Sequence, residues 1–371
     1  MILFVSILLF ISVLYFLLIF LLFWGWIKLE TIKKKKTPFK TKVSIIVPIR
    51  NEEVFIANLI RDLDLQDYPK ENVEVILVND HSNDSSPEII KNLIRNKNQF
   101  SLVQNTKQGK KNAIIEGIKY SKGDLVVTTD ADCQIKSSWL SSLVSLYEFR
   151  KPKMIVGPVV IENSPSFFQK LQALEFLSLT GATAGAIGIN RPIMCNGANL
   201  AFEKEEFGKA KNDLNIRLAS GEDMFLLFSI KRKSKSRILF LKSPDAVIKT
   251  YGRPDLKSFL NQRKRWTSKT RSFSDWDSIG IALLVYLADF SLLVTFIGSF
   301  LYLKMVWLFL TLFILKSIPD FIFLRGLTSY FRVKKLMYIF LPLQFLYFFY
   351  ISFVGILGNF GKYTWKGRKV R

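Results

Sequence analysis

Several residue types and motifs are scarce or missing in this sequence. Only two cysteines, Cys133 and Cys195, occur in 371 residues, which provides no disulfide framework and is typical of a reducing compartment. The chain has no zinc-finger, basic-zipper or RNA-recognition pattern, so nucleic acid does not explain its net charge of +23. It also lacks a Walker-type Gly-x-x-x-x-Gly-Lys-Ser/Thr loop, which argues against a transporter.

Long apolar segments are plentiful by contrast. Hydrophobic residues make up 49% of the chain, and they are concentrated in residues 2–27, 279–303, 305–324 and 336–358. Each segment is long enough to cross a bilayer at about 1.5 Å per residue. The first has no basic n-region and no small-x-small cleavage site, so we expect a retained anchor and not a secretory signal. The sequence predicts a multi-pass cell-membrane protein with a transmembrane helix in residues 1–28, three more within 279–358, and a basic tail at 359–371.

Basic clusters flank these apolar segments at Lys33–Lys36, Arg325–Lys335 and Lys362–Arg371. Such clusters mark the cytoplasmic side and favour anionic membrane lipids, so we expect the intervening domain to be cytoplasmic. Three later spans would then place the tail outside. Either one apolar segment is interfacial or re-entrant, or the tail departs from the rule. Ionisable residues within the segments, such as Lys316 and Asp320 at i,i+4 spacing, predict helices that pack against each other around an internal ion pair.

Residues 41–276 alternate strand-like and helix-like patterns, which predicts one α/β domain with a mostly parallel sheet. The predicted strands are residues 43–48, 73–78, 100–103, 125–129, 154–161 and 197–202. Helix-like patterns follow several of them, including Phe55 to Leu63 and Ile89 to Ile94. Residues 167–189 are apolar with polar interruptions, so they predict an interfacial helix or the wall of an acceptor site more than another span.

Asp130 and Asp132 stand where the buried strand 125–129 ends. In open α/β sheets ligands bind at this carboxyl edge. Two such carboxylates can share Mg²⁺ or Mn²⁺ with phosphate oxygens, although an Asp-x-Asp tripeptide is also common by chance in solvated loops. The strands at 43–48 and 73–78 deliver Glu52 or Glu53 and Asp80 to the same edge, and this convergence predicts a site.

Three further patterns could carry chemistry. Gly109-Lys110 opens a helix, where backbone N–H groups and a lysine can meet an anion. Glu222-Asp223 opens another; the acids can complement the helix dipole, our preferred account for Glu222, or act as a general base. Gln262, Arg265 and Trp266 share one helix face and could bind phosphate and a sugar ring, or serve as an interfacial Trp and a snorkelling Arg.

The ordered set of these motifs resembles the membrane-bound members of glycosyltransferase family 2, the group that includes cellulose synthase, hyaluronan synthase, poly-N-acetylglucosamine synthase and ceramide glucosyltransferase. The resemblance covers residues 42–268. The matching residues are Val-Pro-Ile-Arg-Asn-Glu at 47–52, Asp80, Gly109-Lys110, Asp130-Ala131-Asp132, Gly197-Ala198-Asn199, Glu222-Asp223 and Gln262-x-x-Arg265-Trp266.

The resemblance implies a GT-A fold that binds a nucleotide-diphosphate sugar, most simply UDP-linked, together with Mg²⁺ or Mn²⁺, and that inverts the anomeric carbon. Glu52 and Asp80 would contact the uracil and ribose, Lys110 and Asp130 would hold the nucleotide, and Asp132, with Asp130, would coordinate the metal. Asp223 would deprotonate the acceptor hydroxyl. Gln262, Arg265 and Trp266 would hold the diphosphate and line the acceptor entry.

Two departures from the family pattern bear on this prediction. Gly221 precedes the acidic pair where polymer synthases often have threonine. The chain has fewer predicted transmembrane spans than polymer-secreting synthases have. This favours the transfer of one sugar to a lipid or membrane-associated glycan. The alternatives are a processive polysaccharide synthase, perhaps completed by a protein partner, and a membrane scaffold that binds nucleotide sugars without transferring them.

Overall fold

The computed structural model describes residues 2–32, 38–162, 166–210, 221–267, 274–357, 363–365 and 368–370. The chain forms two compact units. The sheet unit comprises Leu29–Glu162 and Met194–Tyr251, and the membrane unit comprises Met1–Lys28, Asn163–Ile193 and Gly252–Arg371. The predicted α/β class, with a mostly parallel sheet and long apolar helices at both ends of the chain, is confirmed. The basic cluster Lys33–Lys36 lies outside the described residues.

The main sheet has the strand order β3-β2-β1-β4-β7-β5-β8. Its strands are β1 (Val43–Ile49), β2 (Val73–Asn79), β3 (Phe100–Gln104), β4 (Leu125–Thr128), β5 (Met154–Val156), β7 (Leu200–Glu203) and β8 (Ile238–Phe240). The first four in this order run parallel, and β7 runs antiparallel to both β4 and β5. Central strands β1 and β4 are buried along almost their whole length, which explains their unbroken β-branched runs. Because β7 is reversed, the start of β7 lies beside the end of β4.

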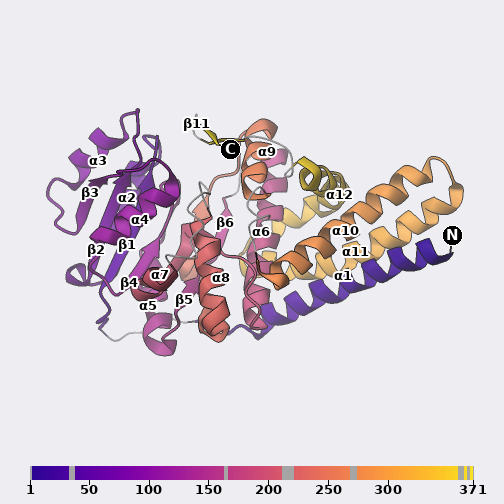
Figure 1. The fold of residues 1–371 in the computed structure, drawn as a ribbon, viewed down its shortest axis with the longest axis horizontal. Helices are drawn as coiled ribbons and strands as arrows, with labels where there is room; N and C mark the ends of the chain where they lie inside the picture. Colours follow the sequence, from indigo (N-terminus) through magenta and orange to yellow (C-terminus); the bar gives the residue numbers. More distant parts are fainter. Residues whose placement is uncertain are drawn as a thin grey trace. The chain divides into compact units, whose positions relative to one another are not determined.

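Helices connect these strands within the sheet unit (Figure 1). They are α2 (Ile56–Asp64), α3 (Ser86–Ile94), α4 (Lys110–Tyr120), α5 (Trp139–Arg150), α7 (Lys204–Ala210) and α8 (Glu222–Ser234). Helix α2 buries Ile56, Leu59, Ile60 and Leu63, the amphipathic face that its sequence predicts. Helix α5 was not predicted from the sequence. Every residue from Trp139 to Tyr147 is buried, so the helix lacks the apolar stripe on one face that identifies an amphipathic helix.

Two predicted strands differ from the structure. Residues 154–161 form two strands, β5 and then β6 (Val159–Ile161), and β6 leaves the main sheet to pair with β9 (Ile248–Thr250). The break falls at Gly157, where a Cβ atom would lie 2.3 Å from the Asn199 side chain, so the chain must turn past that side chain. Residues 197–202 begin as the 3₁₀ turn η2 (Gly197–Asn199), and only then continue into β7.

The membrane unit contains α1 (Ile2–Lys28), α6 (Phe167–Gly188), α9 (Leu256–Thr267), α10 (Trp276–Ser299), α11 (Leu303–Tyr330), η6 (Lys334–Ile339) and α12 (Phe340–Leu357). Helices α1, α10, α11 and the stretch Lys334–Gly355 are long and apolar enough to cross a membrane. Figure 1 shows α1, α10 and α11 side by side. The chain also pairs β10 (Tyr363–Trp365) with β11 (Arg368–Val370) in the predicted tail.

Helix α6 packs closely on α1 through glycines. A Cβ atom on Gly185 would lie 2.1 Å from the backbone oxygen of Leu22, and one on Gly25 would lie 2.1 Å from the oxygen of Gly185. The predicted interfacial helix is therefore packed against the N-terminal anchor, with two backbones nearly in contact.

A polar cluster joins the apolar helices. The predicted Lys316–Asp320 pair is confirmed, with Nζ and Oδ2 3.0 Å apart. Tyr15 of α1 donates to Asp320 at 2.8 Å, and Gln344 of α12 donates to Asp320 at 2.9 Å. Asp289 of α10 lies 3.5 Å from the Lys316 ammonium. The cluster draws its members from all four apolar helices, so these helices pack against each other as the sequence predicts.

Candidate active site

The carboxyl ends of β1, β2 and β4 meet at one edge of the main sheet. Two residues just beyond them adopt left-handed backbone conformations, Asn51 with φ 52° and His81 with φ 55°. Gly109, which caps α4, has φ 116°. Left-handed backbone is uncommon for residues with a side chain, and it tends to occur at functional sites where surrounding contacts maintain it.

Asp80 follows β2 and is 1% exposed. Its Oδ1 atom accepts hydrogen bonds from the Asn105 side chain at 2.9 Å and from the Gly109 backbone N–H at 2.8 Å. Asp80 thus holds the loop that precedes α4 and places Lys110 at the sheet edge. The role predicted for it, contact with a nucleobase and ribose, remains a prediction.

Glu52 follows β1, and its side chain is half-buried. Its backbone N–H donates to the Ser86 hydroxyl at 2.8 Å, while its carbonyl oxygen accepts from Ile56 at the start of α2. Arg50 is a residue that the sequence prediction missed: its Nη1 donates to the carbonyl oxygens of Asp80 and His81, both at 2.9 Å. It therefore ties the ends of β1 and β2 together. Arg50 belongs to the matching motif at 47–52, but no role of its own was predicted for it from the sequence.

Lys110 and Asp130, both predicted to hold the nucleotide, form an ion pair. Their Nζ and Oδ1 atoms are 2.6 Å apart, and both side chains are partly exposed. Beyond β4, the half-buried Asp130 and Asp132 alternate with the buried Ala131 and Cys133. Burial raises the pKa of the Cys133 thiol, and the negative charges of Asp132 and Asp130 raise it further. Both carboxylates therefore concentrate negative charge at this edge, near the lysine.

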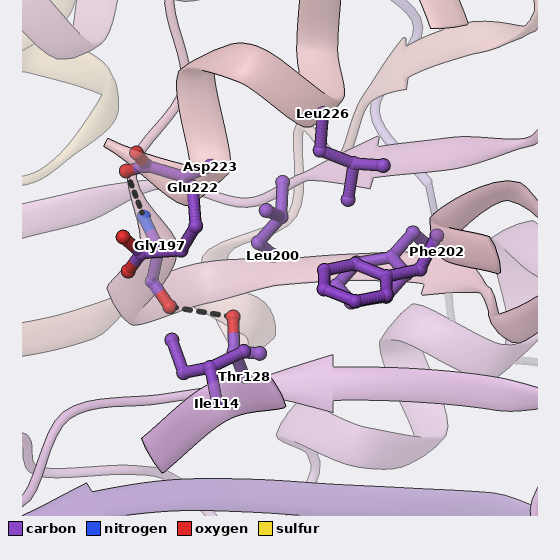
Figure 2. Close-up of a pocket in the computed structure, with 9 residues that line it drawn as sticks. Ile114, Thr128, Gly197, Leu200, Phe202, Glu222, Asp223 and Leu226 are labelled. Atoms are coloured by element: carbon purple, nitrogen blue, oxygen red, sulfur yellow. Dashed lines mark hydrogen bonds between the residues drawn. The ribbon is translucent and has the colours of Figure 1, made fainter. Parts of the chain in front are cut away.

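Asp223 is linked to the end of β4 through Gly197 (Figure 2). The Thr128 hydroxyl donates to the Gly197 carbonyl oxygen at 2.7 Å, and the Gly197 backbone N–H donates to Asp223 Oδ2 at 3.1 Å. The other oxygen, Oδ1, accepts from the Met224 N–H at 2.9 Å. Two backbone donors thus fix the orientation of the Asp223 carboxylate, which remains half-exposed.

The backbone conformation of Gly221 explains why this position has glycine where polymer synthases often have threonine. Gly221 has φ 107° as the cap of α8, a conformation in which a threonine would be strained. Glu222 is buried, and its Oε2 accepts from the Gly221 N–H at 2.9 Å, which fits its predicted role at the helix start. Burial lowers the pKa of Lys111, and the charge of Glu222 opposes that change.

A pocket lies between these elements. Figure 2 shows Glu222 and Asp223 at one end of it, Phe202 and Leu226 at the other, and Leu200 between them. The acidic end adjoins Gly197, and the apolar end is formed by β7 and α8. The pocket thus has one polar end and one apolar wall.

The donor set fits a hard divalent cation in part. Among the residues that the structure describes, no group of three or more His, Cys, Asp and Glu side chains could hold a metal ion alone. Mg²⁺ and Mn²⁺ sites that serve phosphates commonly use one or two carboxylates and complete the shell with water and substrate oxygens. Asp130 and Asp132, adjacent and partly exposed, are a donor pair of this kind.

Gln262, Arg265 and Trp266 all lie on α9 and therefore belong to the membrane unit. The Trp266 ring stands 4.3 Å from the guanidinium of Arg263, which sequence reasoning missed. Arg263 is buried and pairs with the Glu175 carboxylate of α6. Burial by itself would lower the pKa of Arg263, but the charge and hydrogen bond of Glu175, together with Tyr350 and Tyr347, raise that pKa overall.

A mostly parallel sheet with acidic residues at its carboxyl edge, in a chain with four candidate membrane helices, defines a membrane protein with a GT-A-like domain. Comparison with known proteins specifies the family. Residues 125–351 match Glycosyl transferase family group 2, and residues 44–204 match Glycosyl transferase family 2. The chain belongs to glycosyl transferase family group 2, which confirms the family predicted from its motifs.

Individual relatives are distant. The chain is 31% identical over 137 residues to a beta-monoglucosyldiacylglycerol synthase of Trichormus variabilis, covering 36% of this chain and 29% of the relative. It is 25% identical over 228 residues to a dolichyl N-acetyl-alpha-D-glucosaminyl phosphate 3-beta-D-2,3-diacetamido-2,3-dideoxy-beta-D-glucuronosyltransferase of Methanococcus voltae, covering 59% and 70%. The chain thus spans less than a third of the length of the first relative.

The fold is similar to that of the mannosyltransferase PcManGT of Pyrobaculum calidifontis, solved in complex with GDP-Man and Mn²⁺. The TM-score is 0.59 at 17% identity, and the match covers 94% of this chain and 99% of that one. This likeness confirms the predicted GT-A-like fold.

Proposed function

We propose that this protein is a membrane glycosyltransferase that moves one sugar from a nucleotide-diphosphate sugar, UDP-linked, to a hydroxyl of a lipid or membrane-associated glycan. The observation that carries the proposal is the hydrogen-bonded path Thr128–Gly197–Asp223. It fixes a carboxylate beside the end of β4, the strand that Asp130 and Asp132 follow. A base next to an anion-binding edge is the arrangement that sugar transfer requires.

In this proposal Asp223 takes the proton of the acceptor hydroxyl. The hydroxyl oxygen then attacks C1 of the sugar from the face opposite the nucleotide, the bond from C1 to the diphosphate oxygen breaks, and the configuration at C1 inverts. Lys110 and Asp130 hold the nucleotide, and Asp80 and Glu52 lie near its base and ribose. Asp132, with Asp130, would hold Mg²⁺ or Mn²⁺, which offsets the negative charge of the departing diphosphate when bound.

Three observations support a membrane-associated acceptor and a sheet unit on the cytoplasmic side. The relatives named above have lipids in their names, monoglucosyldiacylglycerol as the product of one and a dolichyl N-acetyl-alpha-D-glucosaminyl phosphate in the other. The four candidate membrane helices keep the protein where such acceptors are found. The basic residues flanking the apolar segments favour placing the sheet unit on the cytoplasmic side. The roles of Gln262, Arg265 and Trp266 toward the diphosphate and acceptor remain predictions from the family resemblance.

The test is nucleotide release from a panel of UDP- and GDP-sugars by the full-length protein in native lipid, with Mn²⁺, with Mg²⁺ and with chelator. Asp132→Ala and Asp223→Asn are measured beside the wild type. Asp124→Asn serves as a matched control, since Asp124 is exposed and lies ahead of β4, at the strand's other end. We expect metal-dependent release from one donor, lost by about 10²-fold or more in both site variants and unchanged in the control.

Product length separates the alternatives. One labelled donor should give a short, lipid-extractable product, whereas a long polymer would identify a processive synthase. Metal-dependent nucleotide binding without turnover, in the presence of a lipid extract, would indicate a non-catalytic scaffold. Release that persists in Asp223→Asn would contradict the assignment of the base.

A further inference from the structure

Arg253 lies in the membrane unit, in the short connection that precedes α9. Its backbone is fixed on both sides by one buried side chain of α6: the Arg253 N–H donates to Gln172 Oε1 at 2.8 Å, and Gln172 Nε2 donates to the Arg253 carbonyl oxygen at 2.9 Å. Gln172 is 3% exposed. The Arg253 backbone therefore has little freedom to move.

The Arg253 guanidinium is also held in place. With its amide oriented for hydrogen bonding, the side-chain oxygen of Gln262 accepts from Nε and from Nη2 of Arg253, both at 3.1 Å. These bonds occupy one edge of the planar guanidinium. The neighbouring edge, formed by Nη1 and the second N–H of Nη2, has no hydrogen bond to any described residue. It presents two parallel donors, the pair that binds phosphate or carboxylate oxygens.

Arg253 and Arg263 differ in whether a described carboxylate neutralises their positive charge. Arg263 is 4% exposed and is neutralised by Glu175, which lies one helical turn after Gln172 on α6. Arg253 is half-buried, and no carboxylate among the described residues forms an ion pair with it. Glu175 is already used by Arg263, and both groups that hold Arg253 are neutral amides. Within the described part of the chain, the positive charge of Arg253 is therefore not neutralised by an ion pair.

We propose that Arg253, oriented by Gln262 and Gln172, is a binding site for the phosphate group of a membrane lipid. A guanidinium fork matches phosphate oxygens, and Arg253 belongs to the unit that contains the apolar helices. Helix α9 comes just before α10 in the chain, and basic residues next to apolar spans attract anionic lipids. Gln262 then acts through Arg253. This inference goes beyond the proposed sugar transfer, because the lipid site can bind phosphate in the absence of a sugar donor.

The experiment measures binding to the full-length protein in an uncharged detergent, without donor sugar. The probes are dihexanoyl phosphatidate, dihexanoylglycerol as its phosphate-free analogue, inorganic phosphate, and UDP with Mn²⁺. Arg253→Gln removes the charge, Arg253→Lys keeps the charge without the fork, and Gln262→Leu removes the group that orients the fork. Lys257→Gln is the matched control, because Lys257 is exposed and carries the same charge nearby.

We expect the wild type to bind phosphatidate more tightly than dihexanoylglycerol or inorganic phosphate. Arg253→Gln should weaken phosphatidate binding about tenfold or more, and Arg253→Lys and Gln262→Leu about threefold, with phosphatidate binding unchanged in Lys257→Gln. The UDP affinity should be unchanged in Arg253→Gln, Arg253→Lys and Lys257→Gln. Unchanged phosphatidate binding in Arg253→Gln would overturn the site. If that variant does not fold, unchanged binding in both Arg253→Lys and Gln262→Leu does so instead.

The remaining outcomes distinguish the source of the phosphate. Loss of UDP binding in Arg253→Gln, with phosphatidate binding intact, would make this a nucleotide site and refute the lipid assignment. Inorganic phosphate that binds as tightly as phosphatidate would equally refute it. All of these binding measurements are made without turnover. A negative transferase assay therefore does not affect the test of the lipid site, and absence of lipid binding does not affect the proposed transferase activity.

Discussion

Thr128→Val is the substitution that most directly tests how the candidate base is held. Valine has nearly the shape of threonine but cannot donate the 2.7 Å hydrogen bond to the Gly197 carbonyl oxygen. Thr128 and Gly197 are both buried, so water does not easily replace the lost donor. An unsatisfied buried acceptor of this kind costs about 1–3 kcal/mol of unfolding free energy. We expect a lower midpoint of thermal unfolding.

The effect on activity follows from the second bond of the path. Gly197 also donates to Asp223, so a displaced Gly197 displaces the carboxylate. A shift of about 1 Å in a reacting group can reduce a rate by as much as 10²-fold. We expect the kcat of Thr128→Val to fall about tenfold while the donor KM stays close to wild type, because the nucleotide edge is unaffected.

Thr128→Ser supplies the control. Serine keeps the hydroxyl and loses one buried methyl group, which costs about 1 kcal/mol of stability. It should therefore unfold at a lower temperature yet keep a kcat near that of the wild type. The assay is steady-state nucleotide release over a range of donor concentrations, with thermal unfolding of each variant in the same lipid. Wild-type kcat in Thr128→Val, or an equal loss in Thr128→Ser, would refute the positioning argument.

Two further predictions concern stability. Gly185→Ala should destabilise the membrane unit by about 1–3 kcal/mol, because its Cβ would lie 2.1 Å from the Leu22 oxygen, whereas Gly280→Ala, with no atom within 4 Å, should be neutral or stabilising. Equal unfolding temperatures of the two variants would contradict the close contact. Glu116→Gln should lower the unfolding temperature at pH 7, because the Lys119 hydrogen bond lowers the pKa of Glu116. A carboxylate whose pKa is lowered in the folded state stabilises the fold above its unfolded pKa and loses that contribution as pH falls through its folded pKa. The difference should therefore shrink as pH falls below the ordinary carboxylate range, and a constant difference would refute this.

Much of the sheet unit follows from local sequence patterns. The runs that became β1, β2, β3 and β4 were predicted to within one residue at either end. Burial of β1, β4 and most of β2 selects unbroken apolar, β-branched segments, whereas β3 is only partly buried. The four long apolar segments were equally clear, since composition and length suffice to identify them. Their ends were less accurate: the break predicted near residue 304 lies between Ser299 and Leu303. Helix ends depend on packing partners more than on hydropathy.

Helix α5 and the split between β5 and β6 could not be predicted in this way. Helix α5 is buried on every side, so its sequence has no apolar stripe. The chain turns at Gly157 because of the Asn199 side chain, whose amide donates to the carbonyl oxygens of Pro158 and Ala246. Such partners are distant in sequence, and no window of neighbouring residues contains them.

The sequence by itself determined which residues could carry chemistry: Asp80, Lys110, Asp130, Asp132 and Asp223 could be named because acids and a lysine follow strands or open helices. Only the tertiary structure decided how they are connected. Thr128 reaches Gly197 across 69 residues, and Gly197 reaches Asp223 across 26. Arg253 gave no sequence signal, because its orientation depends on two glutamines from two other helices. Residue type and local periodicity are properties of the chain, whereas the direction of a side chain is set by whatever the fold packs against it.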